Sequence, residues 1–184
     1  MPRSFCLLLF ALVLASSASA QPGSRAVVIN GQRMDASTLS ALEARYQTQV
    51  QAGNYWYDAA SGAWGHVGRP TSGFIPAGLR VGGPLRADAS SGRTSVWVNG
   101  RRLPAQDLRA IERLTGPVEP GRYWLDANGN AGREGGPAQV NLAQLARQAQ
   151  GSGLRRSWLT GIGSNSSGGT GYVMGRDWSV TYGN

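Results

Sequence analysis

Two aspartates stand at matching places in the chain and could carry acid–base chemistry. Asp58 ends the string Tyr-Trp-Tyr-Asp, and Asp126 ends the string Tyr-Trp-Leu-Asp. Two carboxylates that flank a glycosidic bond are the acid and the base or nucleophile of a glycosidase, and Glu134 is a third candidate for that role. An aspartate just before a turn, however, accepts backbone N–H bonds and starts the reversal. We favour the turn role, because it accounts for the aspartate in both strings.

One histidine and one glycine-rich loop are the remaining candidates for catalysis or phosphate binding. His66 is the only histidine, and Arg133 takes its place in the second half of the chain. Histidine catalysis needs positioned partners, so we expect His66 to face solvent. The loop 163–170 nearly matches a phosphate-binding P-loop, but Gly169 stands where that motif requires lysine. The sequence therefore predicts no catalytic residue, no bound metal and no cofactor.

Tryptophan and arginine are the side chains that best suit ligand binding. Aromatic rings stack on sugars, bases or peptide side chains, and arginine contacts anions. Trp56 and Trp124 hold equivalent places, so we expect both to pack in the core, as large aromatic side chains do. Two tryptophans that have no tryptophan at the matching place in the other unit, together with arginines near them in the sequence, form the predicted ligand-binding set. Its members are Trp64, Trp97, Arg69, Arg101 and Arg102. Core packing is the alternative for either of these tryptophans.

The charge of the chain narrows the class of partner. All 18 basic residues are arginine, and the formal net charge is +8. Such an excess favours an acidic polysaccharide, an anionic component of the cell envelope, or nucleic acid. The arginines are scattered, which is typical of a charge that only solubilises the protein. We therefore expect an acidic polysaccharide, an envelope component or a protein as partner, and favour nucleic acid less.

These candidate residues belong to a unit that occurs twice. Residues 27–71 and 96–138 share an apolar triplet, Asn-Gly, an arginine, a helix-like stretch, Gly-x-Tyr-Trp-x-Asp and a glycine-rich close with proline. Asn-Gly after a β-branched or aromatic triplet favours a hairpin with a type I′ turn. Apolar residues at helical spacing follow, and the Tyr-Trp stretch is typical of a strand that a turn reverses. Each unit is therefore expected to be ββαββ.

The two units are expected to share one core. A core from about 45 residues is too small to be stable without a disulfide or a metal, and residues 21–184 contain no cysteine. We therefore predict an α+β fold of two tandem diverged units packed as one domain, with a pseudo-twofold relation. Unit 1 with its linker spans 21–95, and unit 2 spans 96–138. The linker would add five packing residues, Phe74, Ile75, Leu79, Val81 and Leu85.

Both ends of the chain carry further signals. Residues 1–20 combine Arg3, a short apolar run and a small-x-small end, which predicts a signal peptide cleaved after Ala20. The apolar run is too short to span a bilayer, so we expect a secreted or periplasmic protein that does not span the membrane. Residues 139–184 predict a helix capped by Asn141, followed by a glycine-rich β-hairpin.

Part of the chain resembles a segment found in larger proteins. The strings YWYDAASGAWGHVGRP and PLRADASSGRTSVWVNGRRL resemble the segment that precedes the G-protein α domain in the extra-large G proteins of plants. A similar pattern occurs in exported bacterial proteins of unknown function. The resemblance covers residues 53–115, and it implies a shared segment without implying GTP binding.

Overall fold

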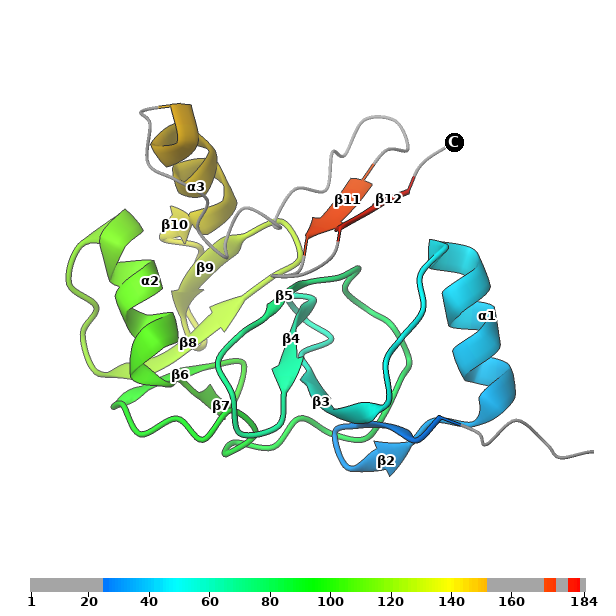
Figure 1. Ribbon diagram of the computed structural model, residues 1–184. Coiled ribbons are helices and arrows are strands. Elements are labelled where there is room, and N and C mark those ends of the chain that lie inside the picture. The colour runs from blue at the N-terminus through cyan, green and yellow to red at the C-terminus, as the bar shows by residue number, and fades with distance from the viewer. Residues whose placement is uncertain (1–24, 152–170, 175–178, 183–184) are drawn as a thin grey trace, which may run out of the picture.

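The computed structural model of the protein describes residues 25–151, 171–174 and 179–182 (Figure 1). The predicted signal peptide and the loop 163–170 lie outside these residues. The fold is α+β, as predicted: two five-stranded mixed sheets, each with a helix, follow one another along the chain. Among the described helices, none has the length and apolar character needed to cross a bilayer.

The first unit forms one sheet with the strand order β2-β1-β3-β4-β5. Strands β1 and β3 are parallel and are joined through helix α1, whereas all other neighbours are antiparallel. The elements are β1 (Val27–Ile29), β2 (Gln32–Arg33), α1 (Ala36–Tyr46), β3 (Gly53–Tyr57), β4 (Ala63–His66) and β5 (Gly73–Phe74).

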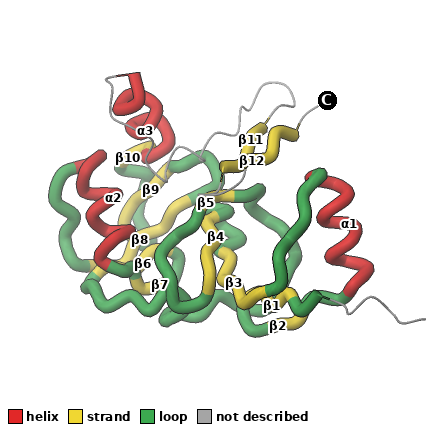
Figure 2. The backbone as a smooth tube through the Cα atoms, viewed as in Figure 1, coloured by secondary structure: helices red, strands yellow, loops and turns green. Residues whose placement is uncertain are grey.

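The second unit repeats this topology with the strand order β10-β9-β8-β6-β7 (Figure 2). Its elements are β6 (Val96–Val98), β7 (Arg101–Arg102), α2 (Ala105–Thr115), β8 (Gly121–Leu125), β9 (Asn130–Arg133) and β10 (Val140–Asn141). Each unit thus has one strand more than the predicted ββαββ. Helix α3 (Leu142–Gly151) follows, and the predicted C-terminal hairpin is formed by β11 (Gly171–Met174) and β12 (Ser179–Tyr182).

The Asn-Gly turns have the predicted type I′ geometry, with positive φ at both residues. The φ angles are 48° at Asn30 and 49° at Asn99, and 79° and 81° at the glycines that follow. Each asparagine side chain also pairs with the neighbouring strand. Asn30 donates to the carbonyl of Tyr57 at 2.8 Å and accepts from its N–H at 2.9 Å, and Asn99 does the same with Leu125. The asparagine therefore extends the sheet by one residue at the tip of the hairpin.

The helices begin at capped residues. Asp35 accepts from the N–H of Thr38 at 2.7 Å at the start of α1, and Asn141 accepts from the N–H of Gln144 at 2.7 Å at the start of α3, as predicted. Pro104 occupies the N-cap position of α2 and makes no side-chain cap hydrogen bond.

Tryptophan lies at the same place in both sheets. The indole of Trp56 lies across Gly65 on the next strand, and that of Trp124 lies across Gly132. Each indole Nε1 donates to a backbone carbonyl of the loop that follows, at 3.1 and 3.0 Å. A Cβ atom at Gly65 would lie 2.8 Å from the indole, so this position requires glycine. The repeated Trp and Gly thus pack against each other in both units.

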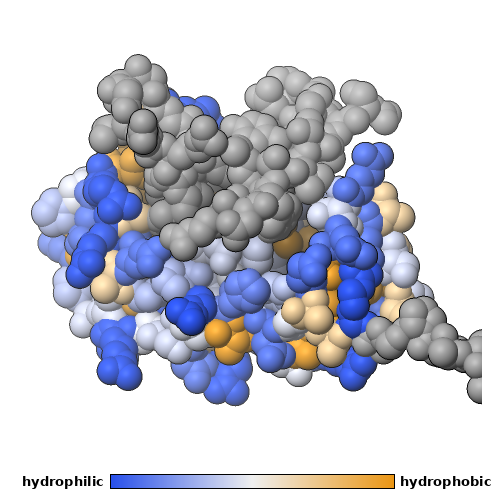
Figure 3. All heavy atoms as spheres, viewed as in Figure 1, coloured by the Kyte–Doolittle hydropathy of each residue, from blue (hydrophilic) through white to orange (hydrophobic). Residues whose placement is uncertain are grey.

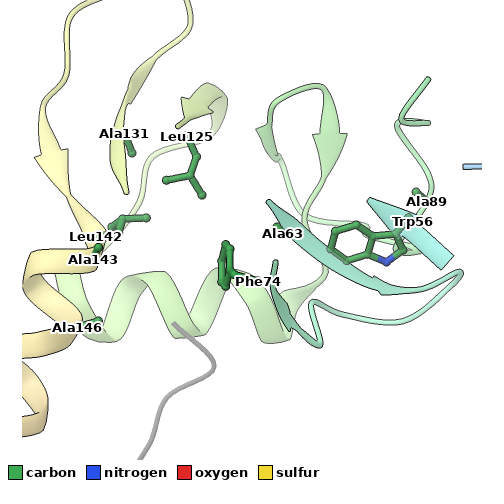
Figure 4. Packing of buried hydrophobic residues seen from close by; sticks show 9 residues of the cluster. All are labelled: Trp56, Ala63, Phe74, Ala89, Leu125, Ala131, Leu142, Ala143 and Ala146. Carbon is green, nitrogen blue, oxygen red and sulfur yellow. The ribbon is translucent and has the colours of Figure 1, made fainter. Parts of the chain in front are cut away.

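The two units share a core, as predicted (Figure 4). In Figure 4, Phe74 from the linker lies between the buried side chains of the first unit and those of the second. The cluster consists of Trp56, Ala63, Phe74, Ala89, Leu125, Ala131, Leu142, Ala143 and Ala146. Of the other linker residues, Leu85 packs against this cluster, and Ile75, Leu79 and Val81 pack against a second cluster beneath α1.

The units pack head to tail, so the predicted pseudo-twofold relation is wrong. A twofold axis would make every contact between equivalent residues occur twice. Arg101 Cζ of unit 2 lies 4.0 Å from the ring centroid of Trp56 in unit 1. Its equivalent in unit 1, Gln32, is exposed, and Trp124 is only half-buried, whereas Trp56 is fully buried.

A second contact is equally one-sided. Asn99 of unit 2 donates to Asp58 Oδ2 of unit 1 at 2.6 Å, whereas Asn30 donates its corresponding N–H to the linker carbonyl of Gly83 at 3.0 Å. The hairpin tip of unit 2 therefore lies on the sheet of unit 1, and no equivalent contact runs in the other direction among the described residues.

The linker loop that precedes unit 2 packs tightly on β7, and Gly92 is the closest point. A Cβ atom at Gly92 would lie 2.1 Å from the carbonyl oxygen of Arg102. We expect Gly92→Ala to lower the free energy of unfolding by about 3 kcal/mol, because the loop and β7 must separate. Urea denaturation measures this change. Gly136→Ala is the matched control, since its Cβ would have only a 3.4 Å contact, and equal effects of the two changes would contradict the prediction.

Candidate functional site

A buried ion pair lies where the two units meet. Arg101 on β7 and Asp107 in the first turn of α2 are 5% and 1% exposed, and the guanidinium lies 3.1 Å from Asp107 Oδ2. Arg101 also donates to Ser90 Oγ at 2.7 Å and to Thr71 Oγ1 at 3.2 Å. Thr71 in turn donates to Asp107 from its hydroxyl at 2.7 Å and from its N–H at 3.1 Å.

This cluster joins four segments of the chain. Thr71 follows β4, Ser90 belongs to the linker loop, and the ion pair comes from unit 2. The position of Asp107 near the amino end of α2 also suits a negative charge, because the helix dipole is positive there. Burial lowers the pKa of Arg101, and the charge of Asp107 opposes that change. The cluster satisfies its own polar groups, so its role is to hold the units together.

A different surface carries the only predicted ligand-binding residues that the structure brings together. Trp97 on β6 pairs in register with Arg102 on β7 and with Arg122 on β8. Directly paired residues on neighbouring strands point to the same face of a sheet, so Trp97 stands between Arg102 and Arg122 on one sheet face. Arg102 Cζ lies 5.2 Å from the Trp97 ring centroid. We call Arg102, Trp97 and Arg122 the Trp97 stripe.

The stripe is accessible and its arginines are oriented. Trp97 and Arg102 are half-buried, and Arg122 is exposed. Arg102 donates to two linker carbonyls at 2.6 and 3.2 Å, and Arg122 donates from Nε to Glu134 Oε2 at 2.7 Å. A guanidinium has five N–H donors, so both arginines keep donors for an anion beyond these contacts. Arg122 is not in the predicted set, because it becomes a neighbour of Trp97 only through the parallel pairing of β6 with β8.

The other predicted binding residues lie elsewhere. Arg101 is inside the molecule, because alternation along β7 points it to the face opposite Arg102. Trp64 lies in the sheet of unit 1, packs against the cluster beneath α1, and has its ring 6.0 Å from that of Tyr55. Arg69 is exposed in the loop after β4. The five predicted residues therefore do not form one site.

Both aspartates lie at turns and are engaged there. Asp58 accepts from the N–H of Ala60 at 3.0 Å and from Ser61 Oγ at 2.5 Å. Asp126 accepts from the N–H groups of Asn128 and Asn130, both at 2.8 Å. These contacts are those of a turn-forming aspartate.

The remaining titratable candidates show no catalytic grouping. His66 is exposed, and its ring lies 4.8 Å from that of Tyr55. Glu134 is 58% exposed and pairs with Arg122. Within the described residues, no three side chains of His, Cys, Asp or Glu are close enough together to hold a metal ion. The side of the molecule seen in Figure 3 is mostly hydrophilic, and Val67, at 53%, is the one large apolar side chain that is mainly exposed in the described part of the chain.

The chain is distantly similar to plant extra-large G proteins. It is 34% identical over 113 residues to "Extra-large guanine nucleotide-binding protein 1" of Arabidopsis thaliana, and 28% identical over 116 residues to "Extra-large guanine nucleotide-binding protein 2" of the same plant. The matches cover 59% and 61% of this chain but only 13% of each relative, and lie in the N-terminal region of those proteins. No family model and no solved structure matches the chain.

One string of this chain holds several contacts of the boundary between the units. The string from Asp88 to Leu103 contains Ser90 and Arg101 of the buried cluster, Gly92 of the tight loop, and Asn99 of the hairpin tip. These residues build the packing of one unit on the other.

Proposed function

We propose that this protein is an exported, non-enzymatic binding module that holds an acidic polysaccharide on the Trp97 stripe. The observation that carries this proposal is the in-register placement of Trp97 between Arg102 and Arg122 on an accessible sheet face. The net charge of +8 supports an anionic partner.

The stripe suits an acidic sugar chain because its two kinds of group have different tasks. The indole offers a flat apolar surface for the face of a sugar ring, and the guanidinium groups on both sides can each pair with a carboxylate or sulfate. A guanidinium is also more weakly hydrated than the ammonium group of lysine, so removing its water to make such contacts costs less free energy. A polymer with a charged group on successive residues can engage both arginines while one ring lies on Trp97.

Titration of intrinsic tryptophan fluorescence with polygalacturonate tests the proposal, with neutral dextran as the ligand control. We expect a saturable change with polygalacturonate alone. Trp97→Leu and the pair Arg102→Gln with Arg122→Gln should each weaken binding about tenfold or more, because each removes a direct contact. Arg109→Gln, an exposed arginine of α2 outside the stripe, is the matched control. An equal loss in that variant would mean that only net charge matters.

Two rival functions predict different results with polygalacturonate. A nucleic-acid binder would prefer single-stranded DNA to polygalacturonate and lose affinity steeply with added salt, because phosphate counterions are released. A hydrolase would produce new reducing ends, and Asp58→Asn or Asp126→Asn would abolish them. For a binding module we expect no turnover, and Glu134→Gln should tighten binding, because it frees Arg122 from its ion pair.

A further inference from the structure

The head-to-tail packing defines what each side of the contact between the units contributes. Unit 1 contributes an aromatic ring and a carboxylate, Trp56 and Asp58, two residues apart on one face of β3 and its end. Unit 2 contributes its hairpin tip, residues 99–101. Arg101 Cζ lies 4.0 Å from the Trp56 ring centroid, and Asn99 donates to Asp58 Oδ2 at 2.6 Å.

Unit 2 carries the same ring and carboxylate. Trp124 and Asp126 stand at the equivalent places, and the indole N–H makes the equivalent bond to the following loop at 3.0 Å. We call these two residues the Trp124–Asp126 surface. Both are half-buried, whereas Trp56 and Asp58 are 0% and 6% exposed. Within residues 25–151, no arginine lies over Trp124 as Arg101 lies over Trp56.

The hairpin tip of unit 1 is covered by the linker and is not free to dock elsewhere. Asn30 in the hairpin tip of unit 1 donates to Gly83 O at 3.0 Å, where Asn99 donates to Asp58. A Cβ atom at Gly82 would lie 2.4 Å from the carbonyl of Ile29, so the linker packs directly on this tip. The tip also carries Gln32 in place of arginine, and Arg101 is buried. A second copy of the chain therefore offers no free tip with an arginine.

We propose that the Trp124–Asp126 surface docks the hairpin tip of another polypeptide, one with the sequence Asn-Gly-Arg and an exposed arginine. The guanidinium lies over the Trp124 indole, and the asparagine amide donates to Asp126, as the tip of unit 2 does on unit 1. Asp126 Oδ2 already accepts from Asn130 at 2.9 Å, and it takes the second donor as Asp58 Oδ2 accepts from both Ser61 and Asn99. The inference rests on the internal contact and is independent of polysaccharide binding.

The Trp97 stripe stays open when such a tip is docked. In unit 1, the equivalents of Trp97, Arg102 and Arg122 are Val28, Arg33 and Asn54, and all three remain partly or fully exposed although the tip of unit 2 is in place. The two surfaces lie on one face of the sheet, with Arg122 and Trp124 two residues apart on β8. The exposure of the equivalent residues in unit 1 indicates that both surfaces can be occupied together.

The test uses the full chain and a head-to-tail cyclised peptide of residues 96–103, VWVNGRRL. Binding is followed by the NMR signal of the Trp124 indole N–H, which is assigned by its loss in Trp124→Phe. The matched control is the same peptide with citrulline in place of its first arginine, which keeps the shape and removes the charge. We expect a saturable shift of the Trp124 signal, and binding about 3- to 30-fold weaker for the citrulline peptide because the cation–π contact is lost.

Three results would overturn the proposal. The first is equal affinity for the two peptides. The second is no shift of the Trp124 signal at millimolar peptide, with the protein folded by circular dichroism. The third is a Trp124 shift that grows with protein concentration alone, which would assign the surface to a second copy of the chain. Polygalacturonate is a different probe from the peptide, and its binding is followed by total tryptophan fluorescence. A failure of that titration would therefore leave the result of the peptide experiment unaffected.

Discussion

Asp107→Ala is expected to lower the free energy of unfolding by about 3–5 kcal/mol, because it leaves the Arg101 charge buried without its partner. The side chain of Asp107 is 1% exposed, and it accepts from both Arg101 and Thr71. Urea denaturation followed by tryptophan fluorescence measures the loss. The contact joins the two units, so the transition is also expected to become less cooperative.

The exposed pair of Arg86 and Asp88 is the matched control for this change. The two charged atoms are 2.8 Å apart, but the side chains are 71% and 68% exposed. Because water screens such a pair, Asp88→Ala should change the free energy of unfolding far less than Asp107→Ala does. Replacing the buried pair together, as Arg101→Met with Asp107→Leu, should recover most of the stability, because no unpaired charge remains. A loss below about 1 kcal/mol for Asp107→Ala would contradict the assignment of the cluster as the joint between the units.

Local features of the fold follow from the sequence because they depend on neighbouring residues. Asn-Gly at 30–31 and 99–100 fixes two type I′ turns, since few other pairs accept positive φ twice. Asn141 caps α3 through one contact three residues away. The repeat itself predicts two copies of one topology. Each copy has too few apolar residues for a stable core of its own, which predicts that the two copies share a core.

The relation between the units depends on contacts that no local pattern reveals. Arg101 and Arg102 are adjacent, and sequence alone gives them one role. The structure separates them, because successive residues of a strand point to opposite faces: Arg101 enters the joint and Arg102 joins the Trp97 stripe. The ion-pair partner of Arg101, Asp107, is six residues away on a helix, and Thr71, which also contacts Arg101, is 30 residues away. The signal that was available is an asymmetry between the repeats, since unit 1 has Gln32 and Thr38 where unit 2 has this ion pair.

The site was predicted in part for the same reason. Trp97 was singled out because unit 1 has Val28 in its place, and Arg102 because it is near in sequence. Arg122 is 25 residues from Trp97 and becomes its neighbour only through the parallel pairing of β6 with β8.

The two equivalent tryptophans provide the sharpest comparison, because their sequence contexts match and their surroundings do not. Trp56→Ala is expected to cost about 3–5 kcal/mol, the range for a fully buried large aromatic side chain, since Trp56 is 0% exposed and lies under Arg101. Trp124→Ala should cost much less, about 1–2 kcal/mol, because part of the indole already faces solvent.

Urea denaturation of the two variants therefore decides how the units are arranged. In a twofold arrangement, both tryptophans would lie in the same interface, and both changes would cost the same. In the head-to-tail arrangement, Trp56→Ala also removes the ring that covers a buried guanidinium. Replacing the ion pair, as Arg101→Met with Asp107→Leu, should therefore cost less stability in the Trp56→Ala background than in the unchanged protein. In the Trp124→Ala background its cost should be the same as in the unchanged protein, because Arg101 does not lie over that ring. Equal costs of the two tryptophan changes, or the same coupling to the ion pair in both backgrounds, would refute the head-to-tail packing.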